Sequence, residues 1–353
     1  MPNALNRVFG FWSKDLGIDL GTANTLVYVR GKGIVINEPS IVAVNQKTGK
    51  ILAMGVEARR MVGRTPGYIQ VSRPLVSGVV SDFEVTEQML KFFIDKVHRE
   101  GGFSLFPRPR VVIGIPSGVT EVEKRAVEDA TYNAGAREVY LIEEPMAAAI
   151  GARLPIHDAV ANVIVDMGGG TTEVAVISMG GLIAAASLRV AGDKLNEDIT
   201  RYLREERNLL IGEATAENLK MMLGSAYPMD EELEGKVRGR DLVSGLPKEI
   251  AVTSEEMREA MDRSIKSIIA AIKNTIEDTP PELTADLVNR QVYLSGGGAL
   301  LRGLDQMITH ATRLNVKIVD DPLTAVVRGC GVVLEDIDKL RTHLVSTHKD
   351  GYV

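Results

Sequence analysis

The chain has 353 residues, which is long for a single hydrophobic core, so we expect at least two domains. Hydrophobic residues make up 45% and charged residues 25%, as in ordinary soluble proteins, and the net charge of -6 argues against general nucleic-acid binding. The single cysteine, Cys330, excludes an internal disulfide and suits a reducing cytosol, and no uncharged run reaches the ~18 apolar residues of a transmembrane helix.

The first half of the sequence predicts short strands followed by helices. Apolar stretches separated by Gly, Asn and Pro are typical of strands, and a helix is expected over 86–100. The stretch RVVIGIPSG predicts a buried strand that ends at Pro116. Thr120 and Glu123 then form a capping box that opens a helix, which Gly135 ends. The first four strands are expected over 16–20, 25–30, 34–37 and 40–44.

The second half repeats this alternation. Strands are expected over 162–166 and 173–177, on either side of a glycine-rich turn. Thr253 and Glu256 form another capping box, which opens a helix with Met and Ile residues at helical spacing. The stretch RQVYLSGGGALLRGLDQMI predicts a strand, a glycine turn and a helix, and alternating strands and helices indicate an α/β protein. Helices are also expected over 193–206 and 216–223, and a small strand-and-loop region over 231–247.

Two glycine-rich hairpins are the main functional signal. The stretch GIDLGTANTLVYV aligns with the later VDMGGGTTEVAVI at a constant shift of 147 positions, which places Asp19 on Asp166 and Gly21 on Gly168. A tight turn of Gly and Thr exposes several backbone N–H groups, and such a turn can wrap a phosphate. Two turns can hold a triphosphate between them, with Mg²⁺ between the phosphates and the aspartates. Two ordinary hairpins are the alternative, but two copies with matching aspartates favour phosphate binding.

Three further groups of residues have both a functional and a purely structural interpretation. Glu143 and Glu144 precede a proline that opens a helix, where a carboxylate could orient an attacking water or only complement the helix dipole. Glu217 and Lys220 face one side of a helix, either as a ribose and adenine clamp or as a surface ion pair of little value. The glycines at 296–298 suggest a turn beneath an adenosine. No Walker A motif occurs, and the histidines lack metal-ligand spacing.

Five motifs together carry a resemblance to a known family. In chain order, GIDLGTANT, GIPSGVTEVEKRA, IEEPMAAAIG, VDMGGGTTEVAVIS and SGGGALLRGLD resemble the MreB family of bacterial actins, and more distantly the actins, sugar kinases and DnaK-type chaperones. The resemblance runs from about Asp15 to about Glu335, and it implies an α/β, actin-like (ribonuclease H-like) fold with two related lobes around a nucleotide cleft, each with a smaller subdomain. The implied division is 1–40, 77–156 and 326–353 for the first large subdomain, 41–76 for the first small one, 157–191 and 253–325 for the second large one, and 192–252 for the second small one.

The resemblance also implies roles for individual residues. Asp19 and Asp166 would serve the Mg²⁺, and Glu144 with Thr171 would position the hydrolytic water. The first hairpin lacks the lysine of eukaryotic actin, so we expect slow hydrolysis. The implied nucleotide contacts are Thr22, Ala23 and Asn24 from the first hairpin, Gly168, Gly169 and Gly170 from the second, Glu217, Asn218, Leu219 and Lys220 for ribose and adenine, and Gly297, Gly298, Ala299 and Leu300 for the base.

The function implied by the resemblance is that of a cytoskeletal ATPase. It would bind ATP or ADP, polymerise into paired protofilaments on the inner face of the cytoplasmic membrane, and organise the cell-wall synthesis that sets a rod shape. Its partners would be further copies of itself, the membrane, and the wall-elongation machinery with its membrane adaptor proteins, and not nucleic acid. Two membrane contacts are expected: the apolar cluster within residues 5–12, and Leu105 and Phe106 beside two arginines. Packing against the body of the protein is the alternative for both.

Other actin-fold ATPases are the competing interpretation. A chaperone would need a substrate-binding domain after the ATPase domain. We expect too few residues for such a domain between the last family motif and Val353. A sugar kinase would need a second ligand pocket with its own acid or base, for which the sequence offers no residue. A plasmid-segregating actin is a closer rival, but its task needs no membrane, whereas the apolar N-terminal cluster and the pair Leu105 and Phe106 indicate one.

Overall fold

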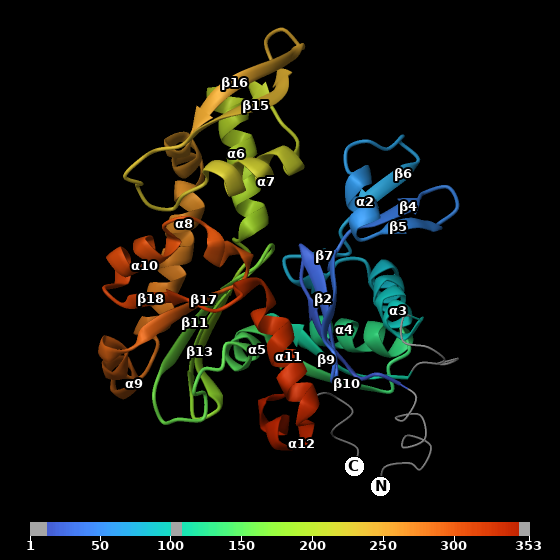
Figure 1. Cartoon of the computed structure of the whole chain (residues 1–353), viewed down its shortest axis with the longest axis vertical. Helices are drawn as coiled ribbons and strands as arrows, with labels where there is room; N and C mark the ends of the chain where they lie inside the picture. Colours follow the sequence, from blue (N-terminus) through green and yellow to red (C-terminus); the bar gives the residue numbers. More distant parts are fainter. Residues whose placement is uncertain (1–12, 100–107, 346–353) are drawn as a thin grey trace. The chain divides into compact units, whose positions relative to one another are not determined.

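The computed structural model describes residues 13–99 and 108–345 (Figure 1). The apolar N-terminal cluster and the pair Leu105 and Phe106 lie outside these described residues. The chain forms two compact units, and the predicted division into four subdomains stays a prediction. Unit 1 is Met1–Asp158, Met179–Leu182 and Thr324–Val353, and unit 2 is Ala159–Ser178 and Ile183–Leu323.

A five-stranded mixed sheet forms the centre of unit 1. Its strand order is β10-β9-β1-β2-β3, in which β1 is antiparallel to β2 and parallel to β9. The three predicted strands of this sheet that come first in the chain form within two residues of their expected bounds. The strands are β1 (Leu16–Leu20), β2 (Asn24–Val29), β3 (Gly33–Pro39), β9 (Arg110–Ile115) and β10 (Glu138–Glu143).

The sheet of unit 2 repeats this topology. Its order, β13-β12-β11-β17-β18, corresponds strand for strand to β3-β2-β1-β9-β10 of unit 1. The register is repeated as well, because Asp19 lies opposite Leu26 and Asp166 lies opposite Glu173, both at the sequence shift of 147. The repeat seen in the sequence is therefore a repeat of structure. The strands are β11 (Asn162–Met167), β12 (Thr172–Ser178), β13 (Gly181–Leu188), β17 (Gln291–Ser295) and β18 (Asn315–Ile318).

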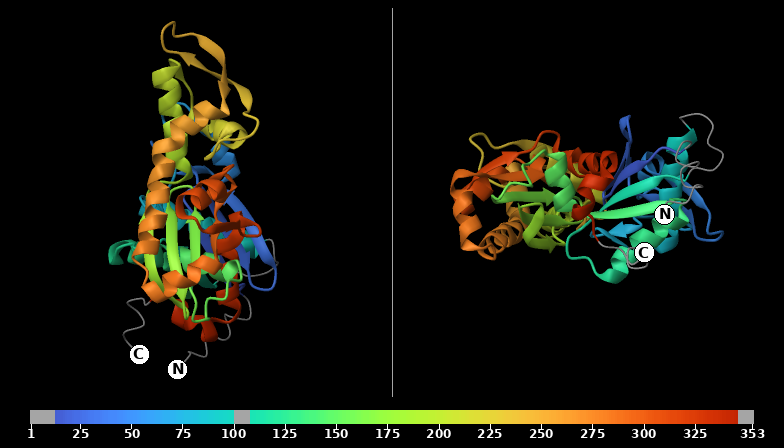
Figure 2. Two further views of the ribbon diagram at one scale, coloured as in Figure 1. Left: turned by 90° about the vertical axis from the view of Figure 1, so that its left-hand side faces the viewer. Right: turned by 90° about the horizontal axis from the view of Figure 1, so that it is seen from below.

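The helices begin where the capping residues predict. Thr120 and Thr253 each accept a hydrogen bond from the amide of the glutamate three residues on, and that glutamate accepts one from the threonine amide, so both capping boxes are confirmed. The helix after the second box, α8, packs on β12 beside the sheet of unit 2 (Figure 2). None of the described helices combines the length and the apolar character needed to cross a bilayer. The helices are α2 (Val56–Met61), α3 (Phe83–Arg99), α4 (Glu121–Asn133), α5 (Glu144–Gly151), α6 (Gly192–Glu206), α7 (Glu213–Leu223), α8 (Ser254–Glu277), α9 (Pro281–Asp286), α10 (Leu304–Thr312), α11 (Ala325–Glu335) and α12 (Ile337–Leu340), with short 3₁₀ turns at Leu287–Asn289, Gly297–Leu300 (η2), Pro322–Thr324 and Arg341–His343.

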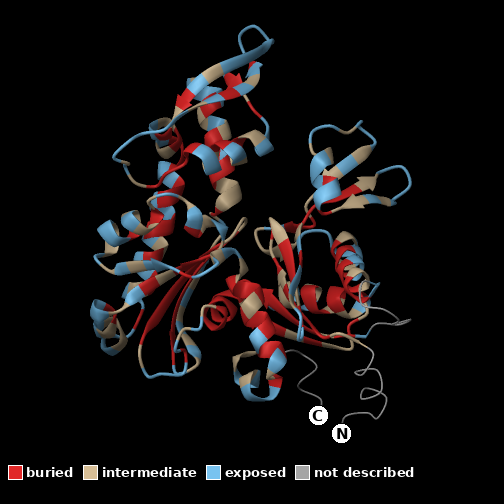
Figure 3. Ribbon diagram, viewed as in Figure 1, coloured by how far each residue is buried: buried red, intermediate tan, exposed pale blue. Residues whose placement is uncertain are grey.

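The two faces of the unit 1 sheet differ in what they contact. Leu16, Ile18 and Leu20 of β1 point to one face and pack in a buried core with α3 and α4. Figure 3 shows the central strands of this sheet largely as buried. Gly17 and Asp19 alternate with them and point to the other face, which α11 covers. In unit 2 the equivalent apolar residues of β11 likewise enter the core, so the aspartate before each glycine-rich turn lies on the face away from that core.

Smaller sheets complete each unit. In unit 1, β4, β5 and β6 form a three-stranded sheet with α2 and a small core of its own. In unit 2, β14, β15 and β16 form another, which confirms the strand-and-loop region expected over 231–247. The elements that the sequence did not predict include β5, β6, β10, β13, β18, α2 and α11. The small strands are β4 (Val42–Asn45), β5 (Ile51–Met54), β6 (Ile69–Ser72), β7 (Leu75–Val76), β8 (Val79–Val80), β14 (Leu209–Leu210), β15 (Glu234–Asp241) and β16 (Pro247–Thr253).

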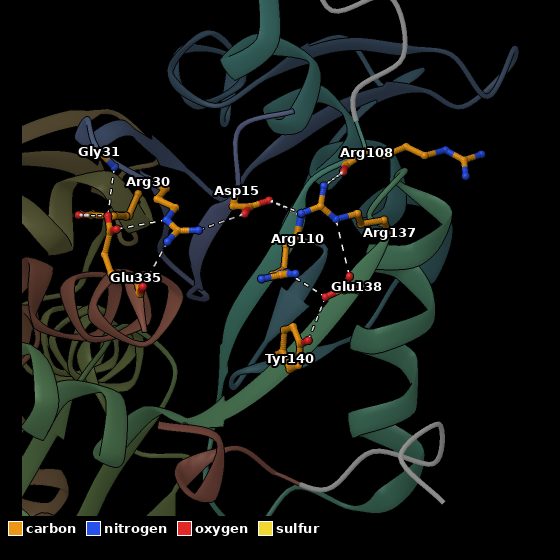
Figure 4. Close-up of polar contacts among 10 residues, drawn as sticks. Asp15, Arg30, Gly31, Arg108, Arg110, Arg137, Glu138, Tyr140 and Glu335 are labelled. Carbon is orange, nitrogen blue, oxygen red and sulfur yellow. Dashed lines mark hydrogen bonds and ion pairs between the residues drawn. The ribbon is translucent and has the colours of Figure 1, made fainter. Parts of the chain in front are cut away.

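Charged side chains connect the starts of the parallel strands in unit 1 (Figure 4). Asp15 accepts a hydrogen bond from the amide of Arg110 (2.9 Å) and pairs with the guanidinium of Arg137 (3.1 Å). The side chain of Arg110 pairs with Glu138 (2.8 Å), which also accepts from the hydroxyl of Tyr140 (3.0 Å). Burial and this carboxylate raise the pKa of Tyr140 to about 12. The network fixes the end of the sheet opposite to the first glycine-rich turn, because that turn follows the carboxyl end of β1.

Candidate functional site

The first glycine-rich turn joins β1 to β2 in unit 1. A Cβ added to Gly21 would lie 2.7 Å from the carbonyl oxygen of Asn24, so the turn requires glycine there. The hydroxyl of Thr22 accepts a hydrogen bond from the amide of Gly78 (2.8 Å). Within residues 13–99 and 108–345, the amides of Thr22 and Ala23 have no protein acceptor, so they can donate to a ligand.

Ser40, which the sequence did not identify as a site residue, holds the first turn in place. Its hydroxyl donates to the carbonyl oxygen of Gly21 (2.6 Å), and its amide donates to that of Ala23 (3.0 Å). The hydroxyl of Thr25 lies 2.8 Å from that of Ser40, and both side chains are fully buried. No local signal marks Ser40, since Gly21 and Thr25 lie 19 and 15 positions away in the sequence.

The second glycine-rich turn joins β11 to β12 in unit 2. The carbonyl oxygens of Gly168 and Gly169 accept hydrogen bonds from the amides of Gly192 (3.2 Å) and Asp193 (2.8 Å), the first residues of α6. The turn therefore lies at the N-terminus of a 15-residue helix, where the helix dipole favours negative charge. The described residues provide no acceptor for the amides of Gly169 and Gly170. These two amides can therefore donate to a ligand.

Asp166 lies in β11 just before the second turn and is buried. Burial raises the pKa of Asp166 to about 6, although the hydrogen bond from the hydroxyl of Ser295 (2.6 Å) acts to lower it. Ser295 ends β17, and the sequence did not identify it because its pairing with Asp166 depends on the parallel neighbour of β11. A buried carboxylate is costly unless a cation or further hydrogen bonds compensate it, so this position suits a bound cation.

Substitution of Asp166 by asparagine tests its ionisation. The ordinary pKa of this carboxyl is 3.8, whereas in the folded protein it keeps its proton up to about pH 6, so between these values the folded state binds more protons than the unfolded state. The free energy of unfolding of the nucleotide-free protein should therefore fall by about 2–3 kcal/mol as the pH rises from about 4 to 7. Asp166→Asn should lack this fall and be more stable by that amount at neutral pH, as measured by urea denaturation. Equal pH dependence in both proteins would contradict the assignment.

The third glycine turn packs directly against the strand that leads into the second. Gly296 has a φ of 79°, and its added Cβ would lie 2.3 Å from the carbonyl oxygen of Met167. A Cβ on Gly298 would lie 2.2 Å from the side chain of Met167, the last residue of β11. The structure thus brings the predicted adenosine turn, η2, next to the predicted phosphate turn of the same unit. Thr171 closes that turn, since its carbonyl oxygen accepts from the amide of Gly168 (2.9 Å).

Lys220 also reaches the second turn. Its ammonium donates to the carbonyl oxygen of Gly192 (2.7 Å), the residue whose amide holds the turn. Lys220 therefore places a positive charge beside the turn. The side chains of Leu219 and Ala299 are buried in the core of unit 2, so only their backbone groups are available to a ligand. Glu217 is half-buried, whereas Asn218 and Leu300 are exposed.

Glu144 is the first residue of α5 and is buried on the face of the unit 1 sheet that α11 covers. A Cβ added to Gly114 of β9 would lie 3.5 Å from the Cγ of Glu144 and 3.1 Å from Val326, so the absent side chain makes room for both. Burial raises the pKa of the Cys330 thiol, and the charges of Asp19 and Glu144 raise it further. Asp19 and Glu144 therefore lie on the same face, at the end where β1 enters its turn.

Each unit thus gathers one set of predicted site residues. Unit 1 contains Asp19, the first turn and Glu144, and unit 2 contains Asp166, the second turn, Lys220 and η2. The role of each residue stays a prediction, as does the idea that both turns bind one nucleotide. Among the described residues, no group of three or more His, Cys, Asp or Glu side chains could hold a metal ion by itself.

Comparison with known proteins agrees with this architecture. The profile of the MreB/Mbl protein family matches residues 13–342. Over 329 residues the chain is 50% identical to the cell shape-determining protein Mbl of Bacillus subtilis (strain 168), covering 93% of this chain and 98% of Mbl. It is 49% identical over 338 residues to MreB of Escherichia coli (strain K12), covering 95% of this chain and 97% of MreB.

Solved structures extend the agreement to the fold. MreB5 of Spiroplasma citri bound to ADP matches with a TM-score of 0.88 at 38% identity, covering 94% of this chain and 98% of MreB5, and its structure bound to AMPPNP gives the same values. The actin-like α/β fold predicted from the sequence is confirmed. With a matching family profile, 50% identity to Mbl over 93% of its length and the fold of MreB5, this chain belongs to the MreB/Mbl family of cell shape-determining, actin-like proteins.

Proposed function

We propose that this chain binds and slowly hydrolyses ATP and polymerises into membrane-associated filaments that organise cell-wall synthesis and set a rod shape. The main support for nucleotide binding is the duplicated glycine-rich turn. Each copy follows a strand with an aspartate on the face away from the core, and each offers backbone amides without a protein acceptor in the described chain. Such amides suit phosphate oxygens, and the related MreB5 has been solved with ADP and with AMPPNP.

The second turn has the stronger electrostatic basis for phosphate binding. It lies at the N-terminus of α6, and the ammonium of Lys220 lies beside it. The first turn has neither a helix N-terminus nor a lysine in its sequence, so its contribution depends on the amides of Thr22 and Ala23. This asymmetry supports the expectation of weak transition-state stabilisation and slow hydrolysis.

The acidic residues fit Mg²⁺ rather than a metal held by protein ligands alone. Mg²⁺ commonly binds one or two carboxylates and completes its shell with phosphates and water. Asp166 is a buried carboxylate whose pKa is raised, so a cation beside it would remove the cost of its ionisation. Asp19 occupies the equivalent position in unit 1. Asp19 and Asp166 would hold the ion, which would neutralise phosphate charge.

Hydrolysis would depend on Glu144, assisted by Thr171. A water attacks the terminal phosphorus of ATP, and the bond to the bridging oxygen of ADP breaks. Phosphate leaves with the oxygen and one proton of the water, and the second proton passes to solvent. Glu144 would accept a hydrogen bond from this water and orient it in line with the bond that breaks. Glu144 is buried at the first residue of α5, so its carboxylate is shielded from bulk water.

Family membership supports polymerisation, and the apolar residues noted in the sequence support membrane binding. The chain would form paired protofilaments, bind the inner face of the cytoplasmic membrane, and work with the wall-elongation machinery and its membrane adaptor proteins. The anchor would be the N-terminal apolar cluster or the pair Leu105 and Phe106, both outside the described residues. A single short segment binds a bilayer weakly, but a polymer repeats the contact many times.

The test is co-sedimentation with anionic liposomes in ATP, in ADP and without nucleotide, with electron microscopy of the pellet. We expect filaments on the lipid in ATP, and a clear loss of lipid binding in the double variant Leu105→Ser, Phe106→Ser or after deletion of residues 1–14. Which change weakens binding more identifies the main anchor. A protein that hydrolyses ATP yet stays monomeric in every condition would instead be a soluble actin-fold ATPase of another role.

A further inference from the structure

The two glycine-rich turns are equivalent by sequence and register, yet different groups hold them. In the second turn, the carbonyl oxygen of Gly168 accepts the amide of Gly192, which begins α6. Gly21 is the equivalent residue of the first turn, at the same shift of 147. In unit 2, α6 follows β13. No helix follows β3, the equivalent strand of unit 1, because the chain continues into β4, so another group must occupy the place of the helix amide.

The hydroxyl of Ser40 occupies that place. It donates to the carbonyl oxygen of Gly21 at 2.6 Å. A carbonyl oxygen can only accept, so the single hydroxyl proton of Ser40 is committed to it, and Thr25 must be the donor in its 2.8 Å contact with Ser40. The amide of Ser40 adds a second bond, to the carbonyl oxygen of Ala23 (3.0 Å). One residue thus binds both sides of the first turn from within a fully buried site.

Ser40 can hold the turn because its own backbone is fixed on both sides. Glu38, two residues earlier, accepts from the amide of Val56 at the start of α2 (2.9 Å) and from the ammonium of Lys96 on α3 (2.9 Å). The next residue, Ile41, accepts from the amide of Gly55 (2.9 Å). The link between β3 and β4 is therefore anchored to two helices, and the hydroxyl of Ser40 has little freedom to follow a moving turn.

We propose that Ser40 is the positioning residue of the first phosphate-binding turn. It contacts no nucleotide, but it directs the amides of Thr22 and Ala23 outward, as the first turn of α6 does for the second hairpin. The inference depends on the proposed nucleotide binding. The role of Ser40 makes a prediction that nucleotide binding alone does not make. Removal of one buried hydroxyl, without any change in a ligand-contacting group, should lower phosphate affinity.

The test compares two variants that each remove only a buried hydroxyl. Ser40→Ala deletes the bond to Gly21, and Thr131→Val deletes a 2.6 Å bond to the carbonyl oxygen of Val127 within α4. Both should lower the thermal stability of the full-length protein by a similar amount. Only Ser40→Ala should weaken Mg–ATP binding, by about tenfold at protein concentrations too low for assembly. Only Ser40→Ala should also speed hydrogen exchange of the amide of residue 40, which donates to the carbonyl oxygen of Ala23.

A second variant and the wild type separate the possible failures. Thr25→Val keeps the Ser40–Gly21 bond and removes only its supporting donor, so we expect about twofold to threefold weaker binding even if Ser40→Ala folds poorly. Unchanged ATP affinity in a folded Ser40→Ala, or an equal loss in Thr131→Val, would overturn the role of Ser40. Failure of the wild-type protein to bind ATP would instead refute the proposed function.

Discussion

Glu144→Gln should lower the rate of ATP hydrolysis by about 10²–10³-fold while leaving ATP affinity within about twofold of wild type. Glutamine keeps the size and one acceptor oxygen of the side chain but loses the negative charge that orients the attacking water. The buried position of Glu144, at the first residue of α5, leaves little room for another group to replace it. Phosphate release is measured under single-turnover conditions, with polymer in the pellet measured in parallel.

The neighbouring carboxylate provides a matched control. Glu143 occupies the N-cap position of α5 without a side-chain capping bond. Burial raises its pKa, against the charge of Lys124, which lowers it. It is adjacent in the chain but has no assigned role, so Glu143→Gln should hydrolyse ATP at close to the wild-type rate. A similar loss in both variants would mean that the helix start, and not the Glu144 carboxylate, matters. Normal hydrolysis by Glu144→Gln would remove Glu144 from the mechanism.

The parts of the fold that the sequence predicted depend on short-range patterns. The two hairpins, both capping boxes and most strands of the central sheets follow from alternation, glycine turns and threonine–glutamate spacing, all of which act within a few residues. The repeated motif also predicted two related halves. Asp19 and Asp166 stand at equal distances from their turns in the sequence, and the structure shows that the strand registers of the two hairpins agree.

The parts that the sequence did not predict depend on contacts between distant segments. Ser40 and Ser295 are ordinary strand-end serines until β3 and β17 bring them to Gly21 and Asp166. The strands β5 and β6 are short and half-exposed, so their apolar pattern is weak. The segment DDPLTAVVRGCG carried no helix prediction, and its two glycines disfavour a helix. It forms most of α11, whose glycines are required by packing.

Gly329→Val should cost about 4 kcal/mol of stability or more and lower the melting temperature by about 10 °C. Helices α5 and α11 pack so closely that a Cβ on Gly329 would lie 1.8 Å from the carbonyl oxygen of Ala147, and a Cβ on Gly151 would lie 1.9 Å from that of Ala325. The two glycines thus let each backbone contact the other. Both obstacles are backbone atoms, which cannot rotate away, so the helices must separate.

The sign of the effect of Gly329→Ala distinguishes packing from helix propensity. Alanine favours an isolated helix by about 1 kcal/mol over glycine, so propensity alone predicts a more stable protein. The contact with Ala147 predicts a net loss of about 2 kcal/mol instead, with slower ATP hydrolysis as α5 carries Glu144 away from Asp19. The control is Gly67→Ala, whose added Cβ meets no atom within 4 Å and should change stability by less than about 0.5 kcal/mol. Thermal and urea unfolding measure all three, and a stabilised Gly329→Ala would show that α5 and α11 are not held in this close contact.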